Sequence, residues 1–268
     1  SINAVGLSLH SLIMALAVSA TPLLIGAFGS WRVAYFLQAG LMLIHLLVWM
    51  VVARDSKAAN PDMDRLLKSS QKPPFGAILR HRHGWHMGFA MFSLAATWTS
   101  IVAFLPTILQ DDRGIVVSSS ALLMGCMYYA LIPGSLFGGF VNRRVPNRKT
   151  LLAAPVLVKA ALAVLATIKS NSILLAVLLT GIGLAWVAVP AIEMLPFELP
   201  GIQPREVAVV SAMYVTLFGL GFAVGPVIVG IVAQVSGSAQ TGLIVLTGLS
   251  GLGVLVGVYY PGYPRIEH

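Results

Sequence analysis

Two ionisable side chains stand inside otherwise apolar stretches of this sequence, Lys159 and Glu193. Lys159 interrupts the run VLVKAALAVLA, and Glu193 lies between Pro190 and Pro196 in a second apolar run. An ionisable group at membrane depth is costly, and where one occurs it commonly binds a substrate or an ion. A carboxylate removed from water also binds a proton more readily. We therefore take Lys159 and Glu193 as candidates for handling a substrate or protons.

Each of these two residues has a structural alternative that the sequence leaves open. Lys159 could lie at the lipid edge or near a helix end, where a long side chain reaches the membrane surface. Glu193 could lie at that surface, where it would cap a helix or pair with Arg205. We interpret Glu198 and Glu206 as interfacial residues of this second kind.

The stretches around these residues are too apolar for a soluble protein. Of 268 residues, 57% are hydrophobic and 10% are charged, whereas a soluble domain has about 25% charged residues. Residues 207–264 contain no charged side chain at all, and about 20 apolar residues suffice to cross a bilayer. The surplus apolar surface must face lipid, so we predict an all-α polytopic membrane helix bundle of about eight transmembrane helices.

Eight apolar segments can be placed between short polar or glycine-containing turns, and residues 54–83 form the one long polar link. The segments are 4–28, 33–53, 84–110, 115–141, 150–168, 172–196, 206–236 and 239–260.

The basic residues gather on one side of these segments. Of 17 Lys and Arg residues, thirteen lie in the 54–83 link, the 142–149 loop, at Arg205 and at Arg265, and three lie on the other side. Cytoplasmic loops of membrane proteins carry such an excess. We predict that the link, the loop and the C-terminus are cytoplasmic and that the protein lies in the cell membrane. The net charge of +8 then reflects topology, and no nucleic-acid partner is expected.

The first and seventh segments share a partial repeat at an offset of 204 residues. The stretch ATPLLIG (20–26) aligns with VGPVIVG (224–230). The aligned pairs are Pro22 with Pro226 and Gly26 with Gly230. A repeat six segments apart indicates a six-helix unit. We therefore expect the chain to hold two helices of one unit and all six of the next, with four helices missing in front of Ser1.

Several motifs resemble those of the major facilitator superfamily over essentially the whole chain. GLGFAVGPVIVG (219–230) resembles the family's G-x-x-x-G-P motif, and GSWRVAYFLQAG (29–40) resembles the Trp-Arg…Phe element that opens its sixth helix. FLPTILQDDRG (104–114) resembles the seventh-helix ending of cyanate-permease-like members. GGFVNRRVPNRK (138–149) resembles the second copy of the family's cytoplasmic loop motif. The loop residues concerned are Gly138, Arg143 and Arg148, with Asn142 where the family usually has Asp.

The resemblance implies helices five to twelve of a twelve-helix transporter whose two halves rock about a midplane site. Residues 1–53 would be the last two helices of the N-terminal half, 54–83 the central linker, and 84–268 the C-terminal half with a short tail. The third, fourth, sixth and seventh segments would then contact the central cavity. This adds four aromatic residues to Lys159 and Glu193 as the expected substrate pathway: Trp98, Tyr128, Trp186 and Tyr214.

The glycines and the basic loop each have a functional and a structural interpretation. Gly221 and Gly225 are four residues apart and share one helix face, where small residues let a neighbouring helix approach closely. Pro226 is expected to bend the same helix. Such packing suits moving halves, and it suits any static bundle as well. Arg143 and Arg148 could form a cytoplasmic latch, or they could supply only the topological charge.

The sequence contains no phosphate-binding P-loop, no G-x-S-x-G turn and no H-E-x-x-H motif, which would mark nucleotide or hydrolytic sites. No metal-ligand spacing is convincing, and neither an enzyme nor a cofactor is expected. We predict a secondary active transporter of a small polar or anionic solute that works by alternating access, with protons as the candidate coupling ion. The alternatives are a proton-coupled drug or metabolite exporter and a non-transporting membrane protein such as a receptor or an enzyme subunit.

Overall fold

The computed structural model describes residues 2–53, 83–145, 147–168 and 171–251, together with Gly76, Leu79 and His81. The regular elements within these residues are all helices, which confirms the all-α expectation. The α-helices are α1 (Ile2–Phe28), α2 (Trp31–Val52), α6 (His83–Asp111), α7 (Val117–Arg144), α8 (Arg148–Ile168), α9 (Ser172–Leu184), α10 (Val189–Ile192), α11 (Pro204–Ser236) and α12 (Ala239–Ser250). Two short 3₁₀ helices are η1 (Ala185–Ala188) and η2 (Leu195–Glu198).

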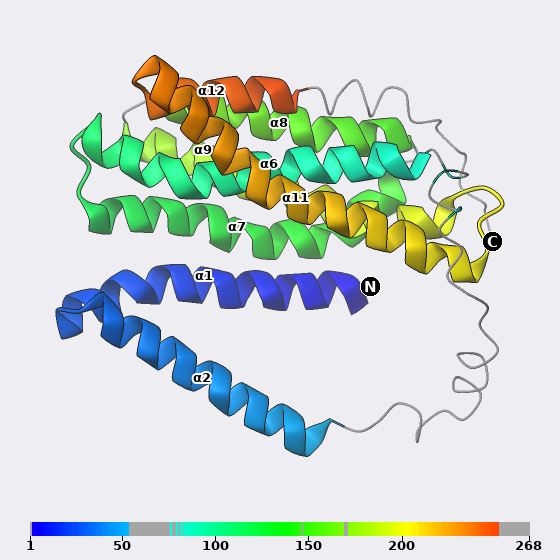
Figure 1. Ribbon diagram of the computed structural model, residues 1–268, viewed down its shortest axis with the longest axis horizontal. Helices are drawn as coiled ribbons and strands as arrows, with labels where there is room; N and C mark the ends of the chain where they lie inside the picture. Colours follow the sequence, from blue (N-terminus) through cyan, green and yellow to red (C-terminus); the bar gives the residue numbers. More distant parts are fainter. Residues whose placement is uncertain are drawn as a thin grey trace.

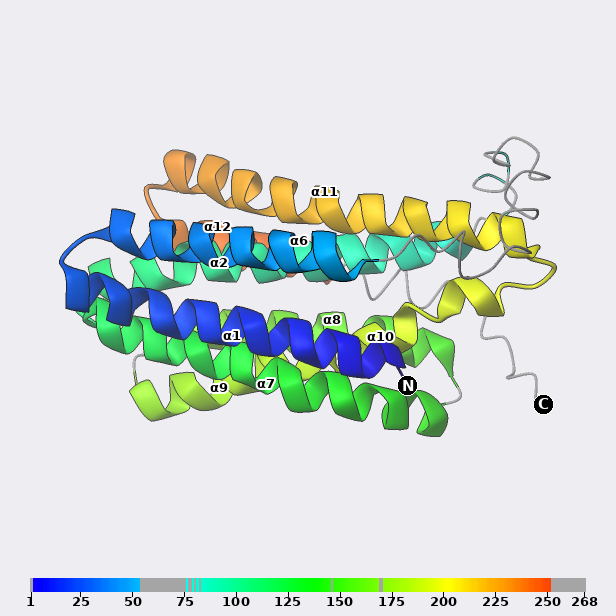
Figure 2. The ribbon, with the colours of Figure 1, turned by 90° about the horizontal axis from the view of Figure 1, so that it is seen from below.

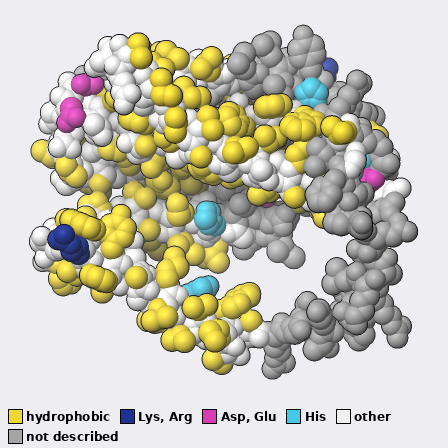
Figure 3. Space-filling model, viewed as in Figure 1, with side chains coloured by type: hydrophobic (Ala, Val, Ile, Leu, Met, Phe, Trp, Pro, Cys, Tyr) yellow, Lys and Arg dark blue, Asp and Glu magenta, His cyan; other side chains and the backbone are white. Residues whose placement is uncertain are grey.

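The observed helices follow the expected apolar segments closely. Among the described residues, α1, α2, α6, α7, α8 and α11 are each long and apolar enough to cross a membrane. The α9–η1 stretch and α12 are shorter apolar helices. On the face seen in Figure 3, hydrophobic side chains extend along the whole described surface, whereas charged side chains appear toward its ends. The chain is therefore a multi-pass membrane protein. Most of the 54–83 link and the last part of the 239–260 segment lie outside the described residues.

The segment expected at 172–196 is not one continuous α-helix. Asn171 caps its start, because its side-chain oxygen accepts hydrogen bonds from the N–H groups of Ile173 and Leu174. The α-helix ends at Leu184 and gives way to η1, α10 and η2. Pro190 and Pro196 lack the N–H that would continue the ladder, which explains the break.

The helices pack into one body to which α1 and α2 are attached on one side (Figure 1). α11 crosses α6 as its main neighbour, and α7 packs against α9 and η1. α1 lies along α7, and α2 diverges from α1, its main contact (Figures 1 and 2). Of the helix α2, only Ala34 is buried within the described structure.

Candidate functional site

A cavity of about 390 Å³ lies between α1 on one side and α6, α7, α10 and α11 on the other. We call it the central cavity. Five of the six residues expected on the substrate pathway line it: Trp98, Tyr128, Trp186, Glu193 and Tyr214. His10 and Ser11 of α1 and Ser135 of α7 add polar groups to the lining of the cavity.

The aromatic side chains of the cavity form a continuous wall. Trp98 of α6 packs edge to face against Tyr128, with ring centroids 5.3 Å apart, and against Trp186, at 5.0 Å. Phe218 continues the wall from Trp186, and Phe222 follows Phe218. Edge-to-face pairs at these distances are favourable beyond the area that they bury. The break after α9 places Trp186 in η1, where it packs against both clusters of the hydrophobic core.

Lys159 does not line the cavity but lies directly behind its aromatic wall. Its ammonium nitrogen is 5.1 Å from the ring centroid of Trp98 and 5.0 Å from that of Trp186. Such cation–π contacts stabilise a cation that has been removed from water. The same nitrogen donates a hydrogen bond of 2.6 Å to the carbonyl oxygen of Leu94. The side chain is 1% exposed, so it reaches neither the lipid edge nor the membrane surface.

No carboxylate pairs with Lys159 in the described part of the chain; the ion pair found there joins His81 and Glu206. In its protonated form, Lys159 would make this region of the protein electropositive. The acid closest to the cavity is Glu193, which follows α10 and lines the cavity together with Tyr214. The side chain of Arg205, considered as a partner of Glu193, lies outside the described residues.

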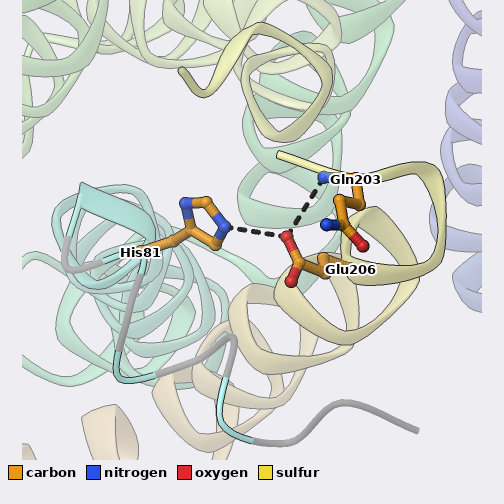
Figure 4. Close-up of polar contacts among 3 residues, drawn as sticks. All are labelled: His81, Gln203 and Glu206. Carbon is orange, nitrogen blue, oxygen red and sulfur yellow. Dashed lines mark hydrogen bonds and ion pairs between the residues drawn. The ribbon is translucent and has the colours of Figure 1, made fainter. Parts of the chain in front are cut away.

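Glu206, interpreted from the sequence as an interfacial acid that caps a helix or pairs with a base, lies in the first turn of α11 and is buried, with 2% of its surface exposed. Its Oε2 atom lies 3.0 Å from Nε2 of His81 and accepts a hydrogen bond of 3.1 Å from the backbone N–H of Gln203 (Figure 4). Gln203 and Glu206 form a capping box at the start of α11. The Gln-x-x-Glu spacing is the sequence signal for the cap, but nothing local indicated His81, which precedes α6.

The glycines of the α11 motif lie against the backbone of α6. A Cβ atom on Gly225 would stand 2.5 Å from the carbonyl oxygen of Ala96, and one on Gly221 would meet the carbonyl of Phe92. Gly26 and Gly230, which belong to the same expected motif, have no atom within 4 Å of that position. Of these four motif glycines, Gly221 and Gly225 are closely packed, and Gly26 and Gly230 are not. The prolines of the motif, Pro22 and Pro226, stand inside α1 and α11.

The basic loop is only partly described. Gly138 packs tightly against η1 and α10, since a Cβ there would stand 2.5 Å from the carbonyl oxygen of Val187 and 2.8 Å from the ring of Pro190. α7 continues to Arg144, so Asn142 and Arg143 are helical, and α8 begins at Arg148. The side chains of Asn142, Arg143 and Arg148 lie outside the described part, and the latch stays a prediction.

The helical bundle and its cavity define a class, namely multi-pass membrane proteins with a ligand-sized chamber between helices. Residues 3–201 match the Major Facilitator Superfamily, and the chain belongs to this family. The uncharacterized transporter YycB of Bacillus subtilis (strain 168) is 26% identical over 211 residues, which cover 78% of this chain and 50% of that protein. The chain thus spans about half the length of this curated relative. The cyanate-permease-like subgroup stays a prediction.

Proposed function

We propose that the protein is a secondary active transporter that moves a small polar or anionic solute through the central cavity by alternating access. The observation that carries this proposal is an aromatic-walled cavity between α1 and the helices α6 to α11, with a buried lysine behind the wall. By the expected repeat, α1 belongs to the first six-helix unit and α6 to α12 belong to the second. Rocking of the two units would open the cavity alternately to the two sides of the membrane.

The position of Lys159 supports an anionic solute. A unit charge about 8 Å away contributes ~2 kcal/mol at an effective dielectric constant of about 20. The two indole rings keep the solute from pairing with the ammonium directly, because they cover it. An anion would therefore be attracted without being trapped, which suits a transporter that must release what it binds.

Glu193 supports coupling to protons. Its carboxylate lines the same cavity, and its negative charge opposes an incoming anion. Protonation removes that charge, so an anion and a proton would occupy the cavity together. This assigns the coupling to one residue that a single substitution can test.

The test for substrate class is uptake by proteoliposomes that contain the protein, with radiolabelled nitrate, cyanate, acetate, acetamide and glycerol as probes. Lys159→Met keeps the length of the buried side chain and removes its charge. We expect uptake of the transported anion to fall at least about tenfold, equivalent to ~1.4 kcal/mol. Uptake of uncharged probes should not fall. Equal anion uptake by the variant and the unaltered protein would refute the role of Lys159, and no uptake of any small solute would refute the proposed function.

The test for coupling is Glu193→Gln in the same vesicles with an imposed pH gradient. We expect the gradient to stop driving accumulation, while exchange of internal for external solute continues. Glu198→Gln is the matched control, because Glu198 is an exposed acid only five residues away and lines no part of the cavity. Unchanged coupling in Glu193→Gln would remove Glu193 from the mechanism. Accumulation driven by an opposite proton gradient would indicate export instead.

A further inference from the structure

A second cavity of about 390 Å³ lies toward the end of the bundle where α1 turns into α2 and α6 into α7. We call it the vestibule cavity. Its polar lining comes from all four of these helices: Thr21 on α1, Gln38 on α2, Gln110 on α6, and Ser120 and Tyr128 on α7. No charged side chain is among its lining residues.

Ser120 is among the residues that line the vestibule cavity, and its buried hydroxyl group has no hydrogen-bond partner within the described structure. The residue is 3% exposed. A buried hydroxyl without a partner is unfavourable, and a solute that formed a hydrogen bond with it would remove that cost. The two preceding residues, Ser118 and Ser119, are exposed at the start of the same helix, so the burial is specific to Ser120.

Thr21 and Gln38 form a polar pair in the lining that α1 and α2 provide. The amide nitrogen of Gln38 donates a hydrogen bond of 2.8 Å to the hydroxyl oxygen of Thr21. That hydroxyl in turn donates one of 2.7 Å to the carbonyl oxygen of Ala17. The pair fixes the orientation of the Gln38 amide in the lining. The lining therefore offers both hydrogen-bond donors and acceptors, as a hydroxyl and an amide do.

Tyr128 borders both cavities. Its ring packs against Trp98 of the aromatic wall, so Tyr128 connects the lining of the vestibule cavity to that wall. A solute that moved from the vestibule cavity to the central cavity would pass Tyr128.

We propose that the vestibule cavity is a second binding site, which takes small solutes carrying both a hydrogen-bond donor and an acceptor and needs no ion pair to hold them. It rests on the proposed function only in that the site would lie on the path to the central cavity. A site without charges binds weakly, and a solute held there can move on.

The experiment is cysteine labelling of the protein in a Cys126→Ala background, with Ser120→Cys as the test variant. Ser119→Cys is the exposed control. Ser100→Cys is the buried control, because Ser100 is also a buried serine without a hydrogen-bond partner in the described part, at 0% exposure, but it lines neither cavity. The reagent is the small neutral hydroxyethyl methanethiosulfonate, and acetamide, which has a donor and an acceptor, is the probe solute.

We expect Ser120→Cys to react within about tenfold of the exposed control, a difference of ~1.4 kcal/mol, and Ser100→Cys to stay unreacted. Acetamide should slow labelling at position 120 and not at position 119, and Gln38→Leu should abolish this protection while leaving access unchanged. A Ser120→Cys variant as inert as Ser100→Cys would overturn the proposal, because the cavity would be inaccessible. Labelling that acetamide does not slow would also overturn it. Neither result depends on transport, so uptake by proteoliposomes would still test the proposed function separately.

Discussion

The proline-containing stretches of α1 and α11 align in sequence and make opposite kinds of contact. In α11, Gly225 precedes Pro226, and the carbonyl oxygen and Cα of Ala96 would lie 2.5 and 2.7 Å from a Cβ on Gly225. In α1, Thr21 precedes Pro22 and lines the vestibule cavity. Where α11 lies directly on the backbone of α6, α1 leaves an open space.

The difference comes from the residue that precedes the proline in each helix. Gly225 has no Cβ, and in a membrane the absence of a side chain lets two helix backbones approach closely. Thr21 occupies the aligned position with a methyl group and a hydroxyl, and its hydroxyl holds Gln38 of α2. The residue before the proline thus accompanies tight packing in one helix and a polar cavity in the other.

Substitution of Gly225 should break the α11 contact and give the largest effect. Gly225→Leu would drive a side chain into the backbone of Ala96, which cannot move aside as a flexible side chain can. Overpacking costs about 1–3 kcal/mol even where neighbours adjust, so we expect loss of folded protein and of transport. The measurements are the yield of monodisperse protein in detergent and the midpoint of thermal unfolding.

Gly230→Leu is the matched control for this prediction. Gly230 lies on the same helix, and no atom is within 4 Å of the place that its Cβ would take. The variant should keep the unfolding midpoint of the unaltered protein. If Gly225→Leu and Gly230→Leu unfolded alike, close approach to α6 would not be what Gly225 provides.

A second contact of α11, between Glu206 and His81 just before α6, should give an intermediate effect when it is removed. Glu206→Ala leaves the N–H of Gln203 and the ring of His81 without their carboxylate acceptor. Loss of a partner in a buried site costs about 1–3 kcal/mol, so the unfolding midpoint should fall. Glu206→Gln keeps an acceptor oxygen, so its unfolding midpoint should fall less than that of Glu206→Ala. Glu198→Ala removes an exposed acid of η2 and serves as the control. If its unfolding midpoint fell as much as that of Glu206→Ala, burial of Glu206 would not explain the effect.

The helix positions could be predicted from the sequence because they depend on local composition, whereas the aromatic lining of the cavity was implied by the resemblance to the family. Segment lengths and apolar runs placed α6, α7, α8 and α11 to within a few residues. Trp98, Tyr128, Trp186 and Tyr214 line one cavity as their segments' positions in the resembled family implied.

What the sequence could not provide depends on neighbours distant in the chain. The sequence does not distinguish Gly225 from Gly230, since both are glycines of one apolar stretch. Only Gly225 lies against the backbone of α6, which leaves no room for a side chain there. Lys159 was predicted either on the substrate pathway or at the lipid edge, whereas it lies behind the aromatic wall, a position that follows from the packing of α8 against α6 and η1. The contact of His81 with Glu206 joins residues 125 positions apart.

The smallest predicted effect sharpens the comparison on the α1 side. Thr21→Val keeps the shape of the side chain and removes the hydroxyl that accepts a hydrogen bond from Gln38. A partly exposed hydrogen bond contributes about 1 kcal/mol or less, so the unfolding midpoint should change little. Protection of a cysteine at position 120 by acetamide should nevertheless weaken, because Gln38 loses its fixed orientation. Thr216→Val is the control: its hydroxyl also donates to the carbonyl four residues earlier, but Thr216 lines neither cavity. Equal protection in the two variants would mean that the Thr21–Gln38 pair does not shape the vestibule cavity, and the contrast between α1 and α11 would then be one of packing alone.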